Sequence, residues 1–169
     1  MRTLSLPALL AALLTVSFAS VPAIASASLG AAPSDFSNAS AVRARQFSAV
    51  APAAASATAS AGAGNVASYT VNETTLDSGT LVREYVGADG SVFAVSWNGP
   101  FLPDLRTLLG AQFATLTAEN AVRAKGSRGQ VRIARNDVVI ESGGHMRAWV
   151  GRAWLVGALP AGFDTGAIQ

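Results

Sequence analysis

The chain has 169 residues, of which 50% are hydrophobic and 13% are charged, and its formal net charge is +2. It contains no cysteine, which excludes a disulfide framework and a lipid-anchored cysteine, so an ordinary apolar core has to hold the fold. The small net charge argues against a nucleic-acid partner, because proteins that bind nucleic acid carry a concentrated basic surface.

Residues 1–27 have the pattern of a signal peptide. Arg2 precedes the apolar run "LSLPALLAALLTVSF", and Ala25 and Ala27 have the spacing that signal peptidase accepts. The apolar run is short for a membrane span and is bracketed by two prolines. We expect export to the periplasm or beyond, with cleavage after Ala27. Cleavage after Ala25 and an uncleaved anchor are the alternatives.

Cleavage after Ala27 would remove Arg2 and lower the net charge to +1. No later segment is long and apolar enough to cross a bilayer, so we expect no transmembrane anchor in the exported protein.

Residues 28–67 are predicted to be an N-terminal segment followed by a low-complexity linker. The first part, "SLGAAPSDF", is too small to fold alone but is able to dock on a domain. From Ser37 to Ala67 the sequence consists mostly of alanine, serine and glycine with a few other residues, a composition that offers little bulky apolar surface to offset the entropy cost of ordering. This composition predicts a flexible linker, with a short helix over Ala39 to Phe47 as an option. It also predicts that residues 28–67 are dispensable for folding.

Residues 68–169 are predicted to form a single domain that begins with three strands. "SYTVNETTL" (Ser68 to Leu76) mostly alternates between apolar and polar residues, as a strand does. "TLVREYV" and "SVFAVSW" are rich in β-branched and aromatic residues, and "GADG" between them predicts a four-residue hairpin loop. The second of these runs is apolar on both faces, which is typical of a central strand.

An amphipathic helix is predicted from Pro103 to Leu116. Proline suits the first turn of a helix, and leucine and phenylalanine recur at the spacing of a single apolar face. Gly110 inside this pattern indicates close packing or a helix end. Two or three more strands follow in "QVRIARNDVVIESGG" and "HMRAWVGRAWLVGAL". The fold class is therefore α+β, a small antiparallel sheet of about five strands in the order β-β-β-α-β-β, with one helix packed on a face.

Three stretches carry a family resemblance: "SGTLVREYVGADGSVFAVSWNGPFLPDLRTLLG", "VVIESGGHMRAWVGRAWL" and the early "SLGAAPSDF". Together they resemble the exported bacterial family catalogued as domain of unknown function 2844. The resemblance covers nearly the whole chain after the signal peptide, apart from the linker. It implies a secreted or periplasmic location and implies no activity, and no catalytic residue carries over from it.

The residues offer little chemistry of their own. His145, the single histidine, is the one candidate catalytic base or metal ligand, but no cysteine or second histidine joins it to form a metal site. No nucleophile motif or phosphate-binding glycine motif is present, so we expect no cofactor and no metal. Arg83 and Glu84 are predicted to form a surface ion pair.

Five basic residues lie within thirteen residues with no acid between them: Arg123, Lys125, Arg128, Arg132 and Arg135. Strand alternation places the last two on opposite faces. The stretch fits a binding patch for an anionic surface polymer, lipid headgroups or an acidic partner protein. We favour the simpler interpretation, a solvated loop and an edge strand, in which arginines discourage aggregation.

Trp97, Trp149 and Trp154 are predicted to be strand residues that pack in the core rather than to line a ligand groove. Trp149 and Trp154 should face opposite sides of the sheet, unless a bulge near Gly151 changes the register. Overall composition and motifs favour a non-catalytic periplasmic or secreted binding or assembly module of the cell envelope. Its partner would be an unknown envelope protein or an anionic surface polymer. The alternative is a small periplasmic hydrolase that uses His145.

Overall fold

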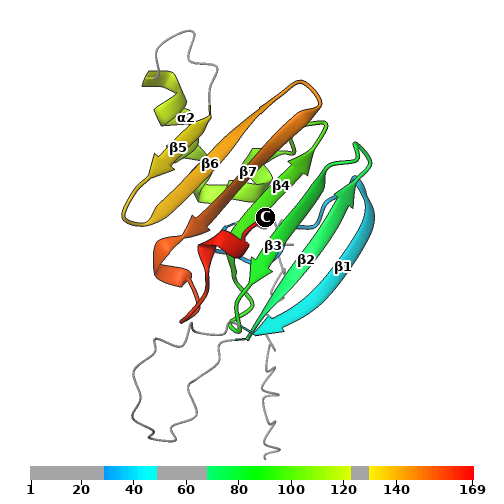
Figure 1. Ribbon diagram of the computed structural model, residues 1–169, viewed down its shortest axis with the longest axis vertical. Helices are drawn as coiled ribbons and strands as arrows, with labels where there is room; N and C mark the ends of the chain where they lie inside the picture. The colour runs from blue at the N-terminus through cyan, green and yellow to red at the C-terminus, as the bar shows by residue number, and fades with distance from the viewer. Residues whose placement is uncertain (1–28, 49–67, 123–129) are drawn as a thin grey trace, which may run out of the picture.

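The structure is a computed structural model that describes residues 29–48, 68–122 and 130–169 (Figure 1). The predicted signal peptide and the linker residues 49–67 lie outside the described residues. Within the described ranges, no helix combines the length and the apolar character that a membrane crossing requires.

The described strands form one antiparallel sheet of seven strands, in the spatial order β1-β2-β3-β4-β7-β6-β5 (Figure 1). In chain order the strands are β1 (Ala39–Ser48), β2 (Ser68–Leu76), β3 (Leu81–Val86), β4 (Val92–Gly99), β5 (Val131–Ala134), β6 (Val138–His145) and β7 (Ala148–Leu155). The α+β class is confirmed, but the expected count of about five strands is too low. One unexpected strand precedes the predicted first strand, and three strands follow the helices, the larger of the two numbers expected there.

The unexpected strand is β1, where the sequence had indicated a flexible linker or a short helix. It pairs with β2 along its whole length, from Ser48 opposite Ser68 to Ala39 opposite Leu76. The linker and helix interpretations are therefore wrong for these residues. The physical reason is that β1 is exposed on both faces and is ordered by main-chain pairing, so it needs few bulky side chains.

The hairpin of β3 and β4 forms as predicted. Gly87 N–H donates to the Ser91 oxygen at 2.8 Å, and Gly90 N–H donates to the Gly87 oxygen at 3.0 Å. Gly90 has φ +80°, a conformation in which glycine avoids the strain of a side chain. The second strand of the hairpin, β4, lies in the middle of the sheet and is buried from Val92 to Trp97, as its apolar pattern on both faces predicts.

The predicted single helix is two helices, α1 (Leu105–Leu109) and α2 (Phe113–Val122), joined by a 3₁₀ turn over Gly110–Gln112. The Asp104 carboxylate caps α1 and accepts the Arg106 N–H at 2.9 Å. Gly110 has φ +49°, which ends α1, so the expected helix end at this glycine is confirmed.

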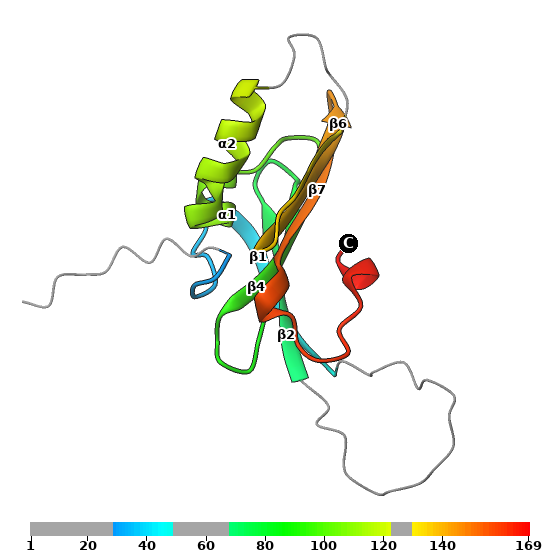
Figure 2. The ribbon, with the colours of Figure 1, turned by 90° about the vertical axis from the view of Figure 1, so that its left-hand side faces the viewer.

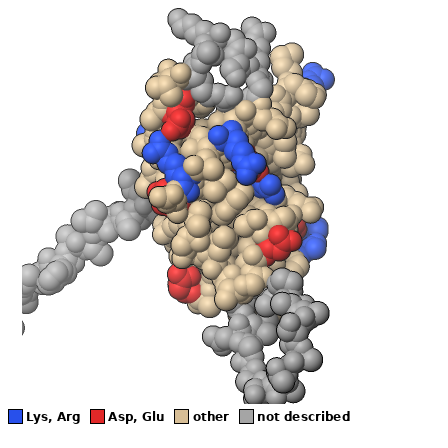
Figure 3. Space-filling view, turned by 60° about the vertical axis from the view of Figure 1, so that its left-hand side comes forward, with Lys and Arg blue, Asp and Glu red and all other residues tan. Residues whose placement is uncertain are grey.

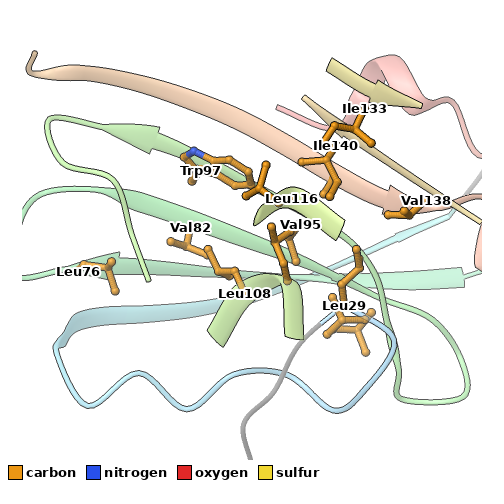
Figure 4. Packing of buried hydrophobic residues seen from close by; sticks show 14 residues of the cluster. Leu29, Leu76, Val82, Val95, Trp97, Leu108, Leu116, Ile133, Val138 and Ile140 are labelled. Carbon is orange, nitrogen blue, oxygen red and sulfur yellow. The ribbon is translucent and has the colours of Figure 1, made fainter. Parts of the chain in front are cut away.

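The helices pack on one face of the sheet, here called the helix face, and the C-terminal segment (residues 156–169) lies on the other, here called the C-terminal face (Figure 2). Figure 4 shows Leu108 and Leu116 directed from the helices toward the strand residues Val82, Val95 and Trp97. These residues belong to the larger apolar cluster of the core. Two short 3₁₀ turns, Val156–Ala158 and Thr165–Ala167, shape the C-terminal segment.

The N-terminal segment joins the core on the helix face. Leu29 is 4% exposed and forms a parallel bridge with Val92, and its N–H donates to the Leu108 oxygen at 3.1 Å. The Gly30 N–H donates to the Val92 oxygen at 2.7 Å. Docking of the "SLGAAPSDF" segment, which the sequence analysis left open, is thus observed for its described residues 29–36. The premise that residues 28–67 add nothing to the fold is wrong for Leu29 and for β1.

The tryptophans follow strand alternation. Trp97 is buried on the helix face, and Trp154 is buried on the C-terminal face. The pairing of β7 with β4 runs without a register shift through Gly151, so Trp149 lies on the face opposite Trp154, as predicted. Gly151 is required because a Cβ atom there would overlap the Trp97 ring.

Candidate functional site

One residue from each of the seven strands contributes to a line of polar side chains across the C-terminal face, here called the polar row. Antiparallel pairing aligns these positions, since every second residue of a strand points to the same face. From β1 to β5 the row reads Arg43, Glu73, Arg83, Ser96, Arg152, Glu141 and Arg132.

Glu73 binds arginines near the β1 end of the row. Its Oε1 accepts a hydrogen bond from Arg83 Nε at 2.8 Å, and its Oε2 lies 3.7 Å from Arg45 Nε. The hydrogen bond from Arg83 lowers the pKa of Glu73, and the charges of Arg83, Arg45 and Arg43 act in the same direction, against the opposing effect of burial. The Glu73 carboxylate is therefore held in its ionised form.

Glu141 occupies the equivalent position near the β5 end. Its Oε2 accepts a hydrogen bond from Arg152 Nε at 2.7 Å, and its Oε1 lies 3.3 Å from Arg132 Nε. The arrangement mirrors that at Glu73, with one less exposed inner arginine and one more exposed outer arginine. The outer side chains are the exposed ones: Arg132 is 73% exposed and Arg45 is 58% exposed.

Positive charge is in excess along the row. Counting Arg45, which lies beside Arg43 on the same face, five arginines surround two glutamates. Figure 3, viewed from the β5 side, shows basic side chains gathered in stripes with acidic side chains next to them. Because Arg45 and Arg132 are more exposed than the inner arginines Arg83 and Arg152, the accessible positive charge lies at the two outer ends of the row.

The C-terminal segment crosses the middle of the polar row. The main-chain oxygen of Gln169 accepts hydrogen bonds from Ser96 Oγ at 2.6 Å and from Arg83 Nη1 at 2.5 Å. Tyr85 donates its hydroxyl to the Ala167 oxygen at 3.2 Å and accepts the Gln169 N–H at 3.1 Å. The row and the neighbouring Tyr85 thus already bind main-chain atoms of their own chain.

Aromatic rings fix the same segment. The Phe163 ring lies 5.0 Å from the Phe93 ring and 5.1 Å from the Tyr69 ring in edge-to-face geometry, between ring centroids. Ile168 is buried at 1% exposure. The segment is therefore an integral part of the C-terminal face.

Two hollows flank the C-terminal segment. The hollow on the β5 side has a volume of about 360 Å³, and its lining includes Arg132, Glu141 and Arg152. The hollow on the β1 side has a volume of about 400 Å³, and its lining includes Arg45 and Glu73. Both volumes fall in the range of small-ligand sites, so the two ends of the row have room for a partner's side chains.

Glu84 is the buried carboxylate of the opposite, helix face. It is 1% exposed, and its two oxygens accept the Ser34 N–H at 2.9 and 3.1 Å. Burial raises the pKa of Glu84, and the hydrogen bonds from Ser34 oppose that effect in part. The predicted ion pair with Arg83 is wrong, because consecutive strand residues point to opposite faces and Arg83 pairs with Glu73 instead.

The predicted basic patch is only partly described. Arg132 belongs to the polar row, whereas Arg135 pairs with Glu119 of α2 on the other side of the sheet. The structure therefore separates these two arginines, as the strand alternation predicted. Arg123, Lys125 and Arg128 lie outside the described residues.

His145 lies at the β6 end of the β6–β7 hairpin and is exposed. Its Nδ1 is 3.1 Å from the main-chain oxygen of the neighbouring Met146, which is the local contact expected of a turn histidine. Within residues 29–48, 68–122 and 130–169, no three histidine, cysteine or acidic side chains gather in a way that could hold a metal ion. A catalytic role for His145 stays an untested prediction.

The sequence reasoning missed most of the polar row. Glu73, Glu141 and Arg152 are single charged residues within otherwise apolar or neutral strand runs, and that isolation is the signal that could have marked them. The missing information was the register, which decides which charges become neighbours.

Comparison with family models and known proteins identifies the family of the chain. No curated protein and no solved structure matches the chain. A family model described as "Protein of unknown function (DUF2844)" matches residues 25–168, which include every described residue except Gln169. The match confirms the resemblance drawn from the run around "WNGPFLPDLRTLLG", and the chain belongs to this family of unknown function.

Proposed function

We propose that this protein is an exported, non-catalytic binding or assembly module of the cell envelope, and that the polar row holds an anionic partner. The observation that supports the proposal is the excess of arginine at the two exposed ends of the row, each beside a hollow. Exposed guanidinium groups in a fixed row attract carboxylate, phosphate or sulfate groups and can bind them in bidentate geometry.

The inner arginines serve a different purpose from the outer ones. Arg83 and Arg152 are committed to glutamate partners and to main-chain oxygens of the C-terminal segment. They set the positions of the glutamates, which in turn orient Arg45 and Arg132. A binding surface of this kind recognises charge and spacing and requires no reacting group.

Retention on a column that carries a sulfated polysaccharide tests the row directly. The double variant Arg45→Glu/Arg132→Glu should elute at a clearly lower salt concentration than the wild-type protein. The matched control is Arg106→Glu/Arg147→Glu, which changes the net charge equally at exposed positions outside the row. If both variants lose the same retention, net charge alone governs binding and the row has no special role.

Export is tested separately by mass spectrometry of the protein recovered from the periplasm or medium. We expect an N-terminus at Ser28. A protein recovered only from the cytoplasm, with residues 1–27 intact, would contradict export.

A further inference from the structure

The outer edge of β1 is long and open. β1 has ten residues and pairs only with β2, and in the part of the chain that the structure describes no strand lies on its other side. The opposite edge of the sheet, β5, has only four residues. An open edge presents unpaired N–H and C=O groups that can pair with a further strand, and the length of β1 makes it the better template.

β1 lacks most of the devices that block edge pairing. Proteins protect edges with proline, bulges, short strands or charged side chains, and β1 carries the charged residues Arg43 and Arg45, which oppose pairing with a basic strand but not with an acidic one. β1 contains no proline, and its one irregularity lies at its beginning, between Ala39 and Ala41. Val42 is 67% exposed and Phe47 is 42% exposed on the same strand. From Ala41 to Ser48 the edge is regular and partly apolar.

The polar row predicts the charge of the missing neighbour. Opposite charges alternate from strand to strand on both sides of the neutral Ser96, and the row ends on β1 with Arg43. Arg45 lies two residues further along the same face and shares Glu73 with Arg83. A strand added beside β1 would continue the alternation if it placed carboxylates opposite these two arginines.

A second copy of this chain fits that edge poorly. Antiparallel pairing of two β1 strands in a register centred on Arg43 to Arg45 would set the arginines of one copy against those of the other. Like charges directly across strands are destabilising.

The other face of the same edge offers a small hollow of mixed lining. It has a volume of about 190 Å³ and is lined by the apolar residues Phe36, Ala39 and Val42 and by polar residues that include Asp35, Thr74 and Glu84. Alternate residues of an added strand would therefore meet arginines on one side and this hollow on the other. Main-chain pairing provides affinity in such complexes, and pockets for alternate side chains provide specificity.

We propose that β1 binds an extended acidic segment of a partner protein as an eighth strand of the sheet. Carboxylates at alternate positions of that segment face Arg43 and Arg45, and an apolar side chain between them faces Val42. This inference rests on the proposed function and specifies its partner as an acidic peptide segment rather than a polysaccharide.

The probe is a fluorescent ten-residue peptide in which glutamate alternates with valine and threonine, and binding to the exported protein is followed by fluorescence anisotropy. Arg43→Glu/Arg45→Glu should weaken binding by roughly tenfold or more, and Arg43→Lys/Arg45→Lys should retain most of it. Arg106→Glu/Arg147→Glu serves as the control of equal charge and should stay within about twofold of wild type. The same peptide with lysine in place of glutamate should not bind. Equal binding of both peptides would overturn the inference.

Hydrogen exchange then locates the contact. Adding the acidic peptide should slow the exchange of β1 amides. The sulfated polysaccharide should bind without that protection, because it has no peptide N–H and C=O groups to pair with a strand. Peptide binding without protection of β1 overturns the edge inference and leaves the proposed function standing. Protection of β1 by self-association in the absence of peptide would identify a second copy as the occupant and overturn it as well. If the peptide fails to bind while the protein is still retained on the sulfated column, only the inference of an added acidic strand is refuted. If the Arg45→Glu/Arg132→Glu variant and its charge-matched control are retained equally, the proposed function is refuted.

Discussion

The two faces of one sheet are built in opposite ways. On the helix face, apolar side chains from six strands and two helices make the larger cluster of the core, and its one buried carboxylate, Glu84, is covered by the N-terminal segment. On the C-terminal face, charged side chains line up in register and pair with one another, with their outer ends in solvent. The comparison teaches that alternation can separate two sets of side chains on the same strands, an apolar set that packs under the helices and a charged set that pairs from strand to strand.

The segments that cover the faces differ in the same sense. The N-terminal segment contributes Leu29 to the core and adds main-chain hydrogen bonds to β4. The C-terminal segment is also packed, through Phe163 and Ile168, but it is held by side chains of the polar row. Changes on the helix face should therefore act on folding, and changes at the ends of the row should act on binding.

Removing the N-terminal segment together with β1 should have the largest effect on stability. A chain that starts at Ala67 loses the burial of Leu29, the pairing of β1 and the hydrogen-bond partner of the buried Glu84. Apolar burial and an unsatisfied carboxylate together should cost roughly 3–6 kcal/mol in the free energy of unfolding. Urea denaturation beside a chain that starts at Ser28 measures this loss. Equal midpoints would show that this part of the chain is dispensable, as composition alone suggested.

Leu109→Ala tests the packing of the helix face at a single point. Leu109 is fully buried where α1 meets the sheet, so its truncation leaves a cavity and should cost about 2–5 kcal/mol. Leu102→Ala is the matched control, because Leu102 lies in the preceding loop at 44% exposure and should change stability by about 0.5 kcal/mol or less. Chemical denaturation of both variants decides the comparison, and similar losses would argue that the helix does not anchor this face.

The two glutamates should give the faces opposite pH dependences. Burial raises the pKa of Glu84 above its ordinary value, so its contribution is fully present below that value and is lost as the pH rises through the folded-state pKa. Hydrogen bonding with Arg83 lowers the pKa of Glu73, so its contribution is present above the ordinary value and is lost as the pH falls through the folded-state pKa.

Glutamine variants separate these two contributions. Relative to wild type, Glu84→Gln should become more stable as the pH rises from below 4.5, the ordinary glutamate value, toward neutrality. Glu73→Gln should be least stable relative to wild type near neutral pH and should approach it in acid. Urea denaturation from acid to neutral pH measures both curves. Parallel curves for the two variants would contradict the assignment of opposite shifts.

Local signals explain what could be predicted of the fold. The loop at Gly87 to Gly90, the two-sided apolar pattern of β4 and the helix end at Gly110 each depend on residues close in sequence. β1 could not be predicted in the same way, because its order comes from pairing with β2 across nineteen intervening residues, and its own side chains stay exposed. Composition measures the capacity to build a core, which an edge strand does not need.

The candidate site was predicted only in part for a related reason. Alternation alone was enough to separate Arg132 from Arg135. The polar row depends also on register, which brings Glu141 between Arg132 and Arg152 although Arg152 follows Glu141 by eleven positions along the chain. No local pattern contains that information, since a shift of one residue in pairing would place the same charges on the other face.

The smallest effect on stability is expected at the tip of the β6–β7 hairpin, which lies outside both terminal segments. His145→Ala removes an exposed ring whose Nδ1 lies near the Met146 oxygen, so the loss of stability should be about 1 kcal/mol or less. Retention on the sulfated column should be unchanged, because the tip is outside the polar row. The measurement matters for the choice between functions. A His145→Ala protein that is fully folded and binds normally, yet lacks a hydrolytic activity found in the wild type, would favour the small hydrolase over the binding module, because neither face of the sheet would then explain the loss.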